Sequence, residues 1–373
     1  MKIIVAMDSF KGTLSAMEAC TIISDVIRES VPGAVVVVKP MADGGEGTAR
    51  AMILAGNGRW IPRTVTGPLT DMKVEAGFGW FDEDRTAIVE MASASGIELL
   101  KPEQLNPMKT TTYGTGELVK SACEYGAKRI LLAVGGSATV DGGIGAAAAL
   151  GWRFLDIDGK PVALTGAGLL QIKEIVSPEI SNMPPVEILC DVDNPLCGRE
   201  GAARVYGPQK GATNEMVEQL DMGLAHLAEC VRIQLGRDIK DVGGAGAAGG
   251  LAGGAMAFMN GTIVSGINTV MARSKLADEM KDADWVITGE GKFDEQSLRG
   301  KVVSGISGLA RRLGVRAAVI AGQVTVAKKA YQKIGVVTAI PCRQEDVSVD
   351  YAMKNSRALL GAAALRFVND YLI

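Results

Sequence analysis

Short apolar runs alternate with amphipathic segments near the start of the chain. Residues 2–7 (KIIVAM) and 34–40 (AVVVVKP) are rich in β-branched residues, as is typical of buried parallel strands. Between them, Ser15 and Glu18 have the spacing of a capping box, and apolar residues recur at helical spacing over residues 19–27. The sequence therefore predicts a strand–helix–strand unit, which indicates an α/β fold.

The end of the chain repeats this alternation. Residues 284–290 are predicted to form a strand and residues 302–314 a helix. Two further strands are expected at 316–322 and 335–341, followed by a closing amphipathic helix over 351–372. We expect the two chain ends to build one doubly wound parallel sheet.

The middle of the chain shows the same kinds of element in a less regular order. Residues 129–134 (RILLAV) and 186–192 (VEILCDV) are predicted strands. A helix is expected near 117–125, and a long helix over 214–235. This central part is therefore expected to be a second α/β domain, inserted into the first.

Composition narrows the class of protein. The 373 residues, 47% hydrophobic and 22% charged, are enough for two folded domains and exclude a disordered chain. A net charge of −3 and only 5% aromatic residues argue against a nucleic-acid-binding surface. The six cysteines include no Cys-x-x-Cys pair, and His226 is the one histidine, so zinc binding and histidine-assisted nucleophiles are not expected. Acid–base chemistry therefore falls to carboxylates and lysines.

No segment of the chain has the pattern of a targeting or membrane sequence. The apolar run before Asp8 is too short for a signal peptide. Residues 242–272 carry no charge, but they are small and glycine-rich, which favours a buried loop and helix over a membrane span. We expect a cytoplasmic protein without nucleic-acid or membrane partners, and self-association stays open.

Polar, glycine-rich loops follow five of the predicted strands. In open α/β sheets the ligand crevice lies beyond the carboxyl ends of the strands, so these loops are candidate active-site loops. They hold, in chain order, Asp8, Ser9 and Lys11; Asp43; Gly135, Gly136 and Ser137; Asp191 and Asp193; and Glu290, Lys292 and Asp294.

These residue types point to phosphoryl transfer. Backbone N–H groups of glycine-rich loops before helices cradle phosphates, and the segment 129–151 has the order strand, glycine loop, helix. Aspartates supply the oxygen ligands that Mg²⁺ prefers. Lysines neutralise the charge of a transferring phosphoryl group.

Two known nucleotide-binding patterns fit poorly. The chain has no Walker A sequence. A G-x-G-x-x-G pattern occurs at Gly244, Gly246 and Gly249, but it follows a poor strand and lacks an acidic residue at the usual distance. A nicotinamide-dependent dehydrogenase of 2-hydroxy acids is therefore a weak alternative.

Two more alternatives come from other classes. A strand followed by Asp191 and Asp193 is similar to the aspartate-nucleophile motif of haloacid-dehalogenase-like phosphatases, although Pro195 stands where Thr or Val is usual. A non-catalytic sensor of small acids would use a similar cleft without needing so many carboxylates.

Six motifs, in this order along the chain, resemble those of the bacterial glycerate kinase family, and most closely its glycerate 2-kinases of glycolate and glucarate breakdown. The resemblance extends from Asp8 to the end of the chain. The motifs are DSFKGTLSA, PMADGGEGT, GGSATVDGGIG, CDVDNPL, GAGAAGGLAGG and GEGKFDEQSLRGKV.

The resemblance implies ATP-dependent phosphorylation of D-glycerate with Mg²⁺. The expected product is 2-phosphoglycerate, with phosphorylation at the 3-hydroxyl as the alternative. The resemblance also implies two α/β domains, one of which is flavodoxin-like and built from both chain ends. We expect this domain at residues 1–68 and 288–373, and the inserted domain at 69–287.

Roles for the candidate residues follow as hypotheses. Asp8, Ser9 and Lys11 are expected to bind glycerate, with Lys11 on its carboxylate. The predicted base is Asp191, with Asp43 as the second choice, and Lys292 is expected to act on the transferring phosphoryl group. The ATP phosphates are expected to bind along Gly135, Gly136, Ser137, Gly244, Gly246 and Gly249. Mg²⁺ is expected to bind to Asp193, Glu290 or Asp294.

Overall fold

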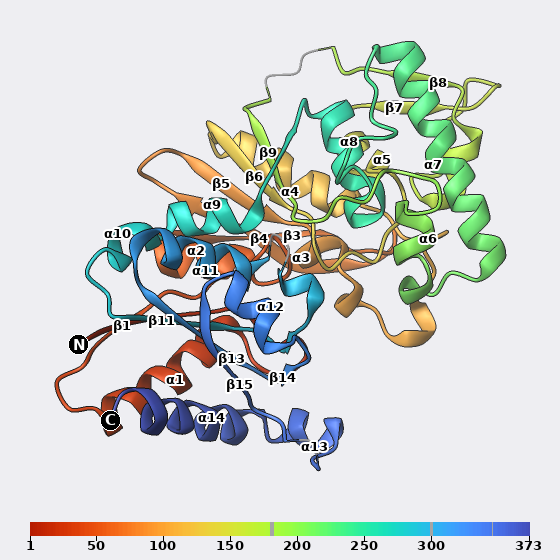
Figure 1. Cartoon of the computed structure of the whole chain (residues 1–373). Helices are drawn as coiled ribbons and strands as arrows, with labels where there is room; N and C mark the ends of the chain where they lie inside the picture. Colours follow the sequence, from red (N-terminus) through yellow and green to blue (C-terminus); the bar gives the residue numbers. More distant parts are fainter. Residues whose placement is uncertain (180–182, 299–300, 345) are drawn as a thin grey trace. The chain divides into compact units, whose positions relative to one another are not determined.

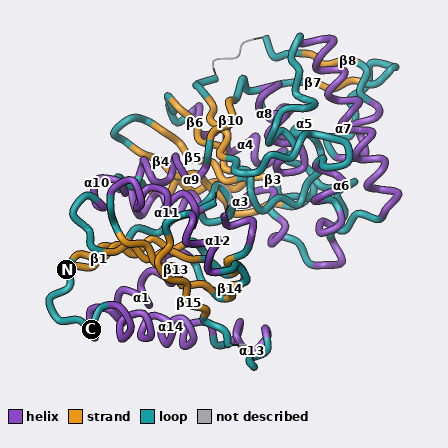
Figure 2. Tube along the Cα trace, viewed as in Figure 1, coloured by secondary structure: helices purple, strands orange, loops and turns teal. Residues whose placement is uncertain are grey.

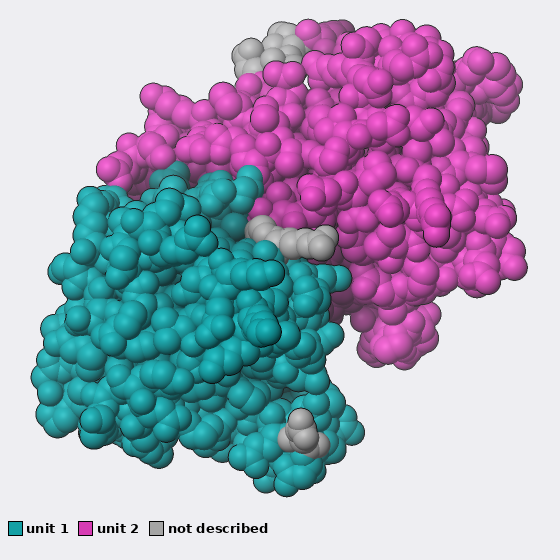
Figure 3. Space-filling view, in the orientation of Figure 1, with its two compact units in different colours: residues 1–43, 50–57, 265–373 teal, residues 44–49, 58–264 magenta. Residues whose placement is uncertain are grey.

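The structure is a computed structural model that describes residues 1–179, 183–298, 301–344 and 346–373. These residues form two compact units, which Figure 3 colours separately. Unit 1 consists of Met1–Asp43, Arg50–Asn57 and Ser265–Ile373, and unit 2 of Gly44–Ala49 and Gly58–Val264. The domain limits expected from the sequence fall at other residues and stay a prediction.

Unit 1 is built on a five-stranded parallel sheet (Figure 1). Two strands from the start of the chain lie beside three from its end, so the predicted doubly wound sheet is confirmed. In sheet order the strands are β15 (Val336–Pro341), β13 (Arg316–Ala321), β11 (Trp285–Gly289), β1 (Lys2–Met7) and β2 (Val35–Val38).

Helices cover both faces of this sheet (Figure 2). On one face, α1 (Ala16–Ser30) packs beside α14 (Ser356–Tyr371), and both bury apolar side chains against β1 and β11. On the other face, Val303 of α11 and Tyr331 of α12 pack with Val319 of β13. Helix α11 comprises Val302–Leu313 and helix α12 comprises Lys328–Lys333. The other helices of the unit are α9 (Gly266–Arg273), α10 (Leu276–Met280) and α13 (Val349–Lys354). The unit also contains the short strands β12 (Lys292–Phe293) and β14 (Gln323–Val324) and the 3₁₀ turn η6 (Glu295–Leu298).

The start of α1 is as predicted, while the closing helix differs. Ser15 Oγ accepts from the Glu18 N–H at 3.3 Å, and the Glu18 carboxylate accepts from the Ser15 N–H at 2.9 Å, which completes the capping box. The single helix expected over 351–372 is instead two helices, α13 and α14, that break at Asn355. Ser348 caps α13, and its side chain accepts from the Tyr351 N–H, so a separate helix starts there.

Unit 2 contains a six-stranded mixed sheet. Its four strands β5, β6, β9 and β10 are mutually parallel, and β3 and β4 extend the sheet in antiparallel pairing. In sheet order the strands are β10 (Thr262–Val264), β9 (Val186–Leu189), β6 (Arg129–Ala133), β5 (Thr86–Glu90), β4 (Lys73–Phe81) and β3 (Arg59–Thr66).

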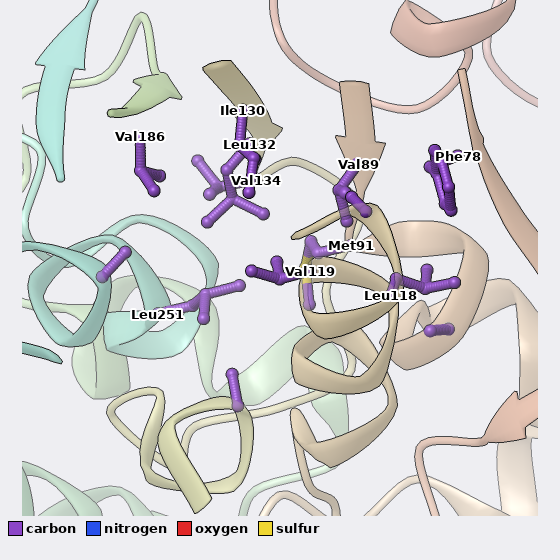
Figure 4. Close-up of a cluster of buried hydrophobic side chains, with 14 of the residues drawn as sticks. Phe78, Val89, Met91, Leu118, Val119, Ile130, Leu132, Val134, Val186 and Leu251 are labelled. Atoms are coloured by element: carbon purple, nitrogen blue, oxygen red, sulfur yellow. The ribbon is translucent and has the colours of Figure 1, made fainter. Parts of the chain in front are cut away.

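The core of unit 2 fills the space between this sheet and its helices. Figure 4 shows this cluster, with Val89, Leu132 and Phe78 from the sheet and Leu118 of α4 and Leu251 of α8 from the helices. A second cluster of buried side chains surrounds the long helix α7, whose bounds are those predicted. The helices are α3 (Ala92–Ser95), α4 (Tyr113–Glu124), α5 (Ile144–Ala149), α6 (Ala202–Tyr206), α7 (Asn214–Leu235) and α8 (Leu251–Phe258).

Short elements complete unit 2. They are β7 (Arg153–Leu155), β8 (Glu174–Val176), η1 (Ile97–Leu99), η2 (Pro102–Gln104), η3 (Gly166–Gln171), η4 (Pro208–Lys210) and η5 (Ala247–Gly250). The helix α2 (Thr48–Gly56) has residues in both units. Among the described residues, no helix has both the length and the apolar character that a bilayer crossing requires.

Gly289 tests how tightly the unit 1 sheet is packed. A Cβ on Gly289 would overlap the carbonyl oxygen of Ile320 in the neighbouring strand, so Gly289→Ala must push β11 and β13 apart. We expect the variant to lose about 2–3 kcal/mol of stability, or roughly 3–4 °C in the midpoint of thermal unfolding measured by calorimetry.

Gly308 provides the matched control for this substitution. It lies in α11, and its nearest atom is the flexible Arg312 Nη1 at 3.8 Å, so Gly308→Ala should leave the midpoint unchanged or raise it slightly. An unchanged midpoint in Gly289→Ala, or an equal loss in Gly308→Ala, would contradict this account of the sheet.

Candidate active site

A pocket of about 420 Å³ lies in unit 1, beyond the carboxyl ends of its strands. The chain leaves β1 toward β2 on one side of the sheet, whereas β11 lies on the other side, so the strand order reverses between β1 and β11. Ligands of open α/β sheets bind at such a reversal point. Seven of the predicted site residues line the pocket together: Asp8, Ser9, Lys11, Asp43, Glu290, Lys292 and Asp294.

Backbone pairing beyond the strands fixes the acidic residues at this edge. The N–H of Asp8 donates to the Gly289 carbonyl at 2.9 Å, which extends the pairing of β1 with β11 by one residue. On the other side of β1, the N–H of Met41 donates to the Met7 carbonyl at 2.9 Å. The chain thus brings Asp8, Asp43 and Glu290 to one pocket from three neighbouring strands.

Asp8 is the most strongly perturbed acid of this pocket. Its side chain is buried, and Ser9 donates its N–H to Asp8 Oδ1 at 2.6 Å. The pKa of Asp8 is raised to about 8, mainly by burial and then by the charges of Asp43 and Glu290, while the Ser9 hydrogen bond and Lys11 act in the lowering direction. At pH 7 this carboxyl is therefore mostly protonated, and it ionises near the pH at which enzymes commonly operate.

Glu290 adds a second partly desolvated acid. Burial raises its pKa, against the lowering effects of a hydrogen bond from Ser297 and of the nearby Lys301. Within the part of the chain that the structure describes, its Oε1 atom is buried and has no hydrogen-bond partner. A buried acceptor without a partner is costly, and a bound cation or hydroxyl group would remove that cost.

Cations and an apolar wall complete the pocket. Lys292 Nζ lies 3.1 Å from Asp294 Oδ2, and Lys11 stands exposed in the tight loop between Phe10 and Leu14. The side chains of Lys301 and Arg343 also line the pocket, as do the apolar residues Phe10, Val349, Met353 and Leu359. The site thus offers donors for a small anion beside acceptors for its hydroxyl groups.

The predicted metal ligands do not form a preassembled metal site. Among the described residues, no three His, Cys, Asp or Glu side chains are grouped so that they could hold a metal ion. Glu290 and Asp294 share the pocket of unit 1, whereas Asp193 belongs to unit 2. Because Mg²⁺ bound to a nucleotide takes only one or two protein carboxylates, the unpartnered oxygen of Glu290 fits such a role.

The second group of predicted residues lies in unit 2, where Gly135, Gly136 and Ser137 follow β6. Gly136 is exposed and has a φ of +73°, a conformation that favours glycine. Among the described residues, nothing accepts from the N–H groups of Gly136 and Ser137. Successive N–H groups in a turn of this kind form a concave site for an anion.

The start of α5, next along this loop, already holds an anion of its own. The buried carboxylate of Asp141 accepts from the Thr112 N–H and hydroxyl, both at 2.8 Å, and from the Gly143 N–H at 3.1 Å. Gly145 also donates its N–H to it, and burial raises the pKa of Asp141 against these bonds. Among the described residues of this loop, the N–H groups of Gly136 and Ser137 have no acceptor, so the 135–137 turn is the part that can bind an external phosphate.

Gly244, Gly246 and Gly249 have a packing role in unit 2. The N–H groups of Gly244 and Gly246 both donate to the Asn194 carbonyl, at 3.1 and 3.0 Å. A Cβ on Gly249 would overlap the Thr139 carbonyl oxygen, so this segment lies directly against the 135–145 loop. Their assignment to the nucleotide stays a prediction, and two of the three amides are already engaged.

Asp191 and Asp193 follow β9 in unit 2, as expected from the sequence. Asp191 is half-buried and Asp193 is exposed. Their loop packs against Gly243 and Gly244, through the Asp193 and Val192 carbonyls. The roles predicted for the two aspartates stay predictions.

Sequence reasoning missed two buried charged residues in unit 2. Glu90, the last residue of β5, accepts from the N–H groups of Gly47 and Ala49 at 2.7 and 3.0 Å and so anchors the loop before α2. A carboxylate at a strand end was a signal that could have found it. Lys210 is fully buried, and nothing in its local sequence indicated this.

One predicted motif is only partly described. The GEGKFDEQSLRGKV motif spans residues 289–302, and its residues 299 and 300 lie outside the described part of the chain.

Known proteins match the chain over nearly its whole length. A glycerate kinase of Haemophilus influenzae is 46% identical over 328 residues, covering 86% of both chains. A glycerate 2-kinase of Escherichia coli K12 is 44% identical over 331 residues, covering 87% of this chain and 86% of the relative.

A solved structure and a family model agree with these relatives. A crystal structure described as a glycerate kinase 2 from Salmonella typhimurium LT2 superposes with a TM-score of 0.84 at 40% identity, covering 99% of this chain and 97% of the other. The model of the glycerate kinase family matches residues 3–372. The chain belongs to the glycerate kinase family.

Proposed function

We propose that the protein transfers the terminal phosphoryl group of MgATP to the 2-hydroxyl of D-glycerate and releases 2-phosphoglycerate. One observation carries this proposal: the unit 1 pocket, at the reversal point of the sheet, combines the carboxyls of Asp8, Asp43 and Glu290 with the lysines of the same loops. The family supports a kinase, and the 44% identical glycerate 2-kinase supports the 2-position. The phosphatase and dehydrogenase alternatives have no such support.

Glycerate is a small anion with two hydroxyl groups, and the pocket offers partners for each part. The exposed ammonium of Lys11 is suited to bind the carboxylate, with the Ser9 hydroxyl as a second donor. Lys292 is placed to neutralise charge on the phosphoryl group once its own partner, Asp294, interacts with Mg²⁺. Bound Mg²⁺ would supply charge neutralisation of the phosphates, with Glu290 and Asp294 as its protein ligands.

The proton of the attacking hydroxyl must pass to a base. Asp43 is close enough to Asp8 for its charge to raise the pKa of Asp8, and a base works best when its pKa is near the working pH. We assign the base role to this pair, so that the ionised member accepts the hydroxyl proton. Asp191, the first choice from the sequence, remains the competing assignment.

The ATP phosphates are assigned to the turn at Gly135–Ser137. Among the described residues, the N–H groups of Gly136 and Ser137 have no acceptor, and Gly136 is exposed; both observations support this choice. The amides of Gly244 and Gly246 are engaged by Asn194 and contribute less to it.

Product analysis tests the reaction directly. Purified protein is incubated with MgATP, with and without D-glycerate, and ADP release is followed together with immediate conversion of the product by enolase. We expect glycerate-dependent ADP and enolase turnover without any mutase, because enolase consumes only the 2-phosphate. ADP without direct enolase turnover would move the acceptor to the 3-hydroxyl, and no glycerate-dependent ADP would refute the proposal.

Three matched substitutions decide the base. We expect either Asp8→Asn or Asp43→Asn to lower kcat by about 10²- to 10⁴-fold, the usual contribution of general base catalysis, according to which member of the pair accepts the proton. Asp191→Asn is an equally isosteric substitution, and we expect it to lower kcat far less. A large loss in Asp191→Asn, with near-normal turnover in the other two, would transfer the role to Asp191.

A further inference from the structure

Lys210 in unit 2 is a buried lysine that the proposed reaction does not yet use. Its residue is 1% exposed, and it ends the short turn η4, where its N–H donates to the Gly207 carbonyl at 3.0 Å. The next residue, Gly211, has a φ of +87°, and a Cβ there would overlap the Leu105 carbonyl oxygen. The backbone of this turn is therefore fixed, and it directs a cation into the interior of unit 2.

The ammonium of Lys210 is committed to the glycine loop that follows β6. Nζ donates to Ser137 Oγ at 2.6 Å and to the Thr139 carbonyl at 2.7 Å. Burial lowers the pKa of Lys210 to about 7, against the opposing effect of the fully buried Asp141. A buried ammonium is costly, and an apolar side chain could fill the same space without that cost.

The contact with Ser137 sets what the serine can do. A serine hydroxyl has one proton to donate, and here its oxygen accepts from Lys210, so the proton is left for another acceptor. The N–H groups of Gly136 and Ser137 in the same turn have no acceptor among the described residues. Among the described residues, three donors of one turn are thus unengaged, and the Lys210 amine, which is positively charged when it is protonated, lies against this turn.

We propose that Lys210 is a positioning residue for the nucleotide phosphates: its buried ammonium holds the 135–137 turn in place, directs the Ser137 hydroxyl outward as a donor, and makes the turn favourable for an anion. Lys210 acts through Ser137 and the loop backbone. The inference rests on the proposed assignment of the ATP phosphates to this turn.

The test compares Lys210→Met with Arg237→Met. Methionine keeps most of the length of lysine and removes the charge. Arg237 is a matched control, because it is a partly buried cation of unit 2 whose Nη1 donates to the Met256 and Ala257 carbonyls at the end of α8. For each variant we measure kcat, KM for ATP and KM for D-glycerate, and the affinity for MgAMP-PNP by calorimetry.

We expect Lys210→Met to raise KM for ATP and weaken MgAMP-PNP binding at least tenfold, while KM for D-glycerate changes less than twofold. Arg237→Met should leave all three values within twofold of the wild type. Because Lys210 acts through Ser137, the double variant Lys210→Met/Ser137→Ala should bind MgAMP-PNP little worse than the weaker single variant.

Other outcomes separate this inference from the proposed function. MgAMP-PNP affinity within twofold of the wild type in Lys210→Met, or fully additive losses in the double variant, would overturn the role of Lys210. An equal loss of MgAMP-PNP affinity in Arg237→Met would show that the effect comes from general destabilisation of the protein, and it would also overturn the proposed role of Lys210. A wild type that binds MgAMP-PNP but does not phosphorylate glycerate would refute the proposed substrate alone, and the binding comparison would still decide on Lys210.

Discussion

Removal of carboxyl groups from water at one edge of the unit 1 sheet is the constraint on which the rest of the site depends. Parallel pairing of β1 with β11 and β2 brings the side chains of Asp8, Glu290 and Asp43 into one pocket. Burial disfavours the ionised forms of Asp8 and Glu290, and the nearby charge of Asp43 adds to this, so the pKa values of both Asp8 and Glu290 are raised. A fold optimised for stability alone would avoid this arrangement, so its presence indicates a chemical use.

In unit 2, three buried charged groups each have several hydrogen-bond partners. Asp141 is surrounded by N–H and hydroxyl donors, Glu90 holds two N–H groups, and Lys210 donates to two oxygens. These bonds fix the loop before α2 and the loop after β6 from the inside. Buried polar groups that are hydrogen-bonded make a structure rigid, and a rigid loop can present amides to a phosphate.

The sequence predicted the elements of unit 1 well because they carry strong local signals. Apolar runs with polar loops at their ends mark β1, β11, β13 and β15, and the Ser15–Glu18 box marks the start of α1. The closing helix was predicted as one element, since apolar spacing continues across Asn355 and the Ser348 cap was overlooked.

The site was harder to predict than the fold. Asp8, Asp43 and Glu290 could be grouped because strand ends of one sheet lie side by side, a rule that needs no side-chain detail. Lys210 could not be found in this way, since its partners are 71 and 73 residues away and only the folded chain shows that it is buried. Nor could the pattern distinguish glycines that pack closely, such as Gly246 and Gly249, from those that offer free amides.

The pH dependence of stability tests the desolvation of Asp8 most directly. The pKa of an aspartate is near 4 in the unfolded chain, whereas the pKa of Asp8 in the folded protein is about 8. Between these pH values Asp8 keeps its proton in the folded state and loses it in the unfolded state. The free energy of unfolding therefore decreases as the pH rises through this range. Asp8→Asn has no such group. The free energy of unfolding should therefore shift in favour of Asp8→Asn between pH 5 and 8.5, by on the order of 3 kcal/mol, while exposed Asp25→Asn shows no comparable change. A difference between Asp8→Asn and the wild type that stays constant over this range would contradict the account.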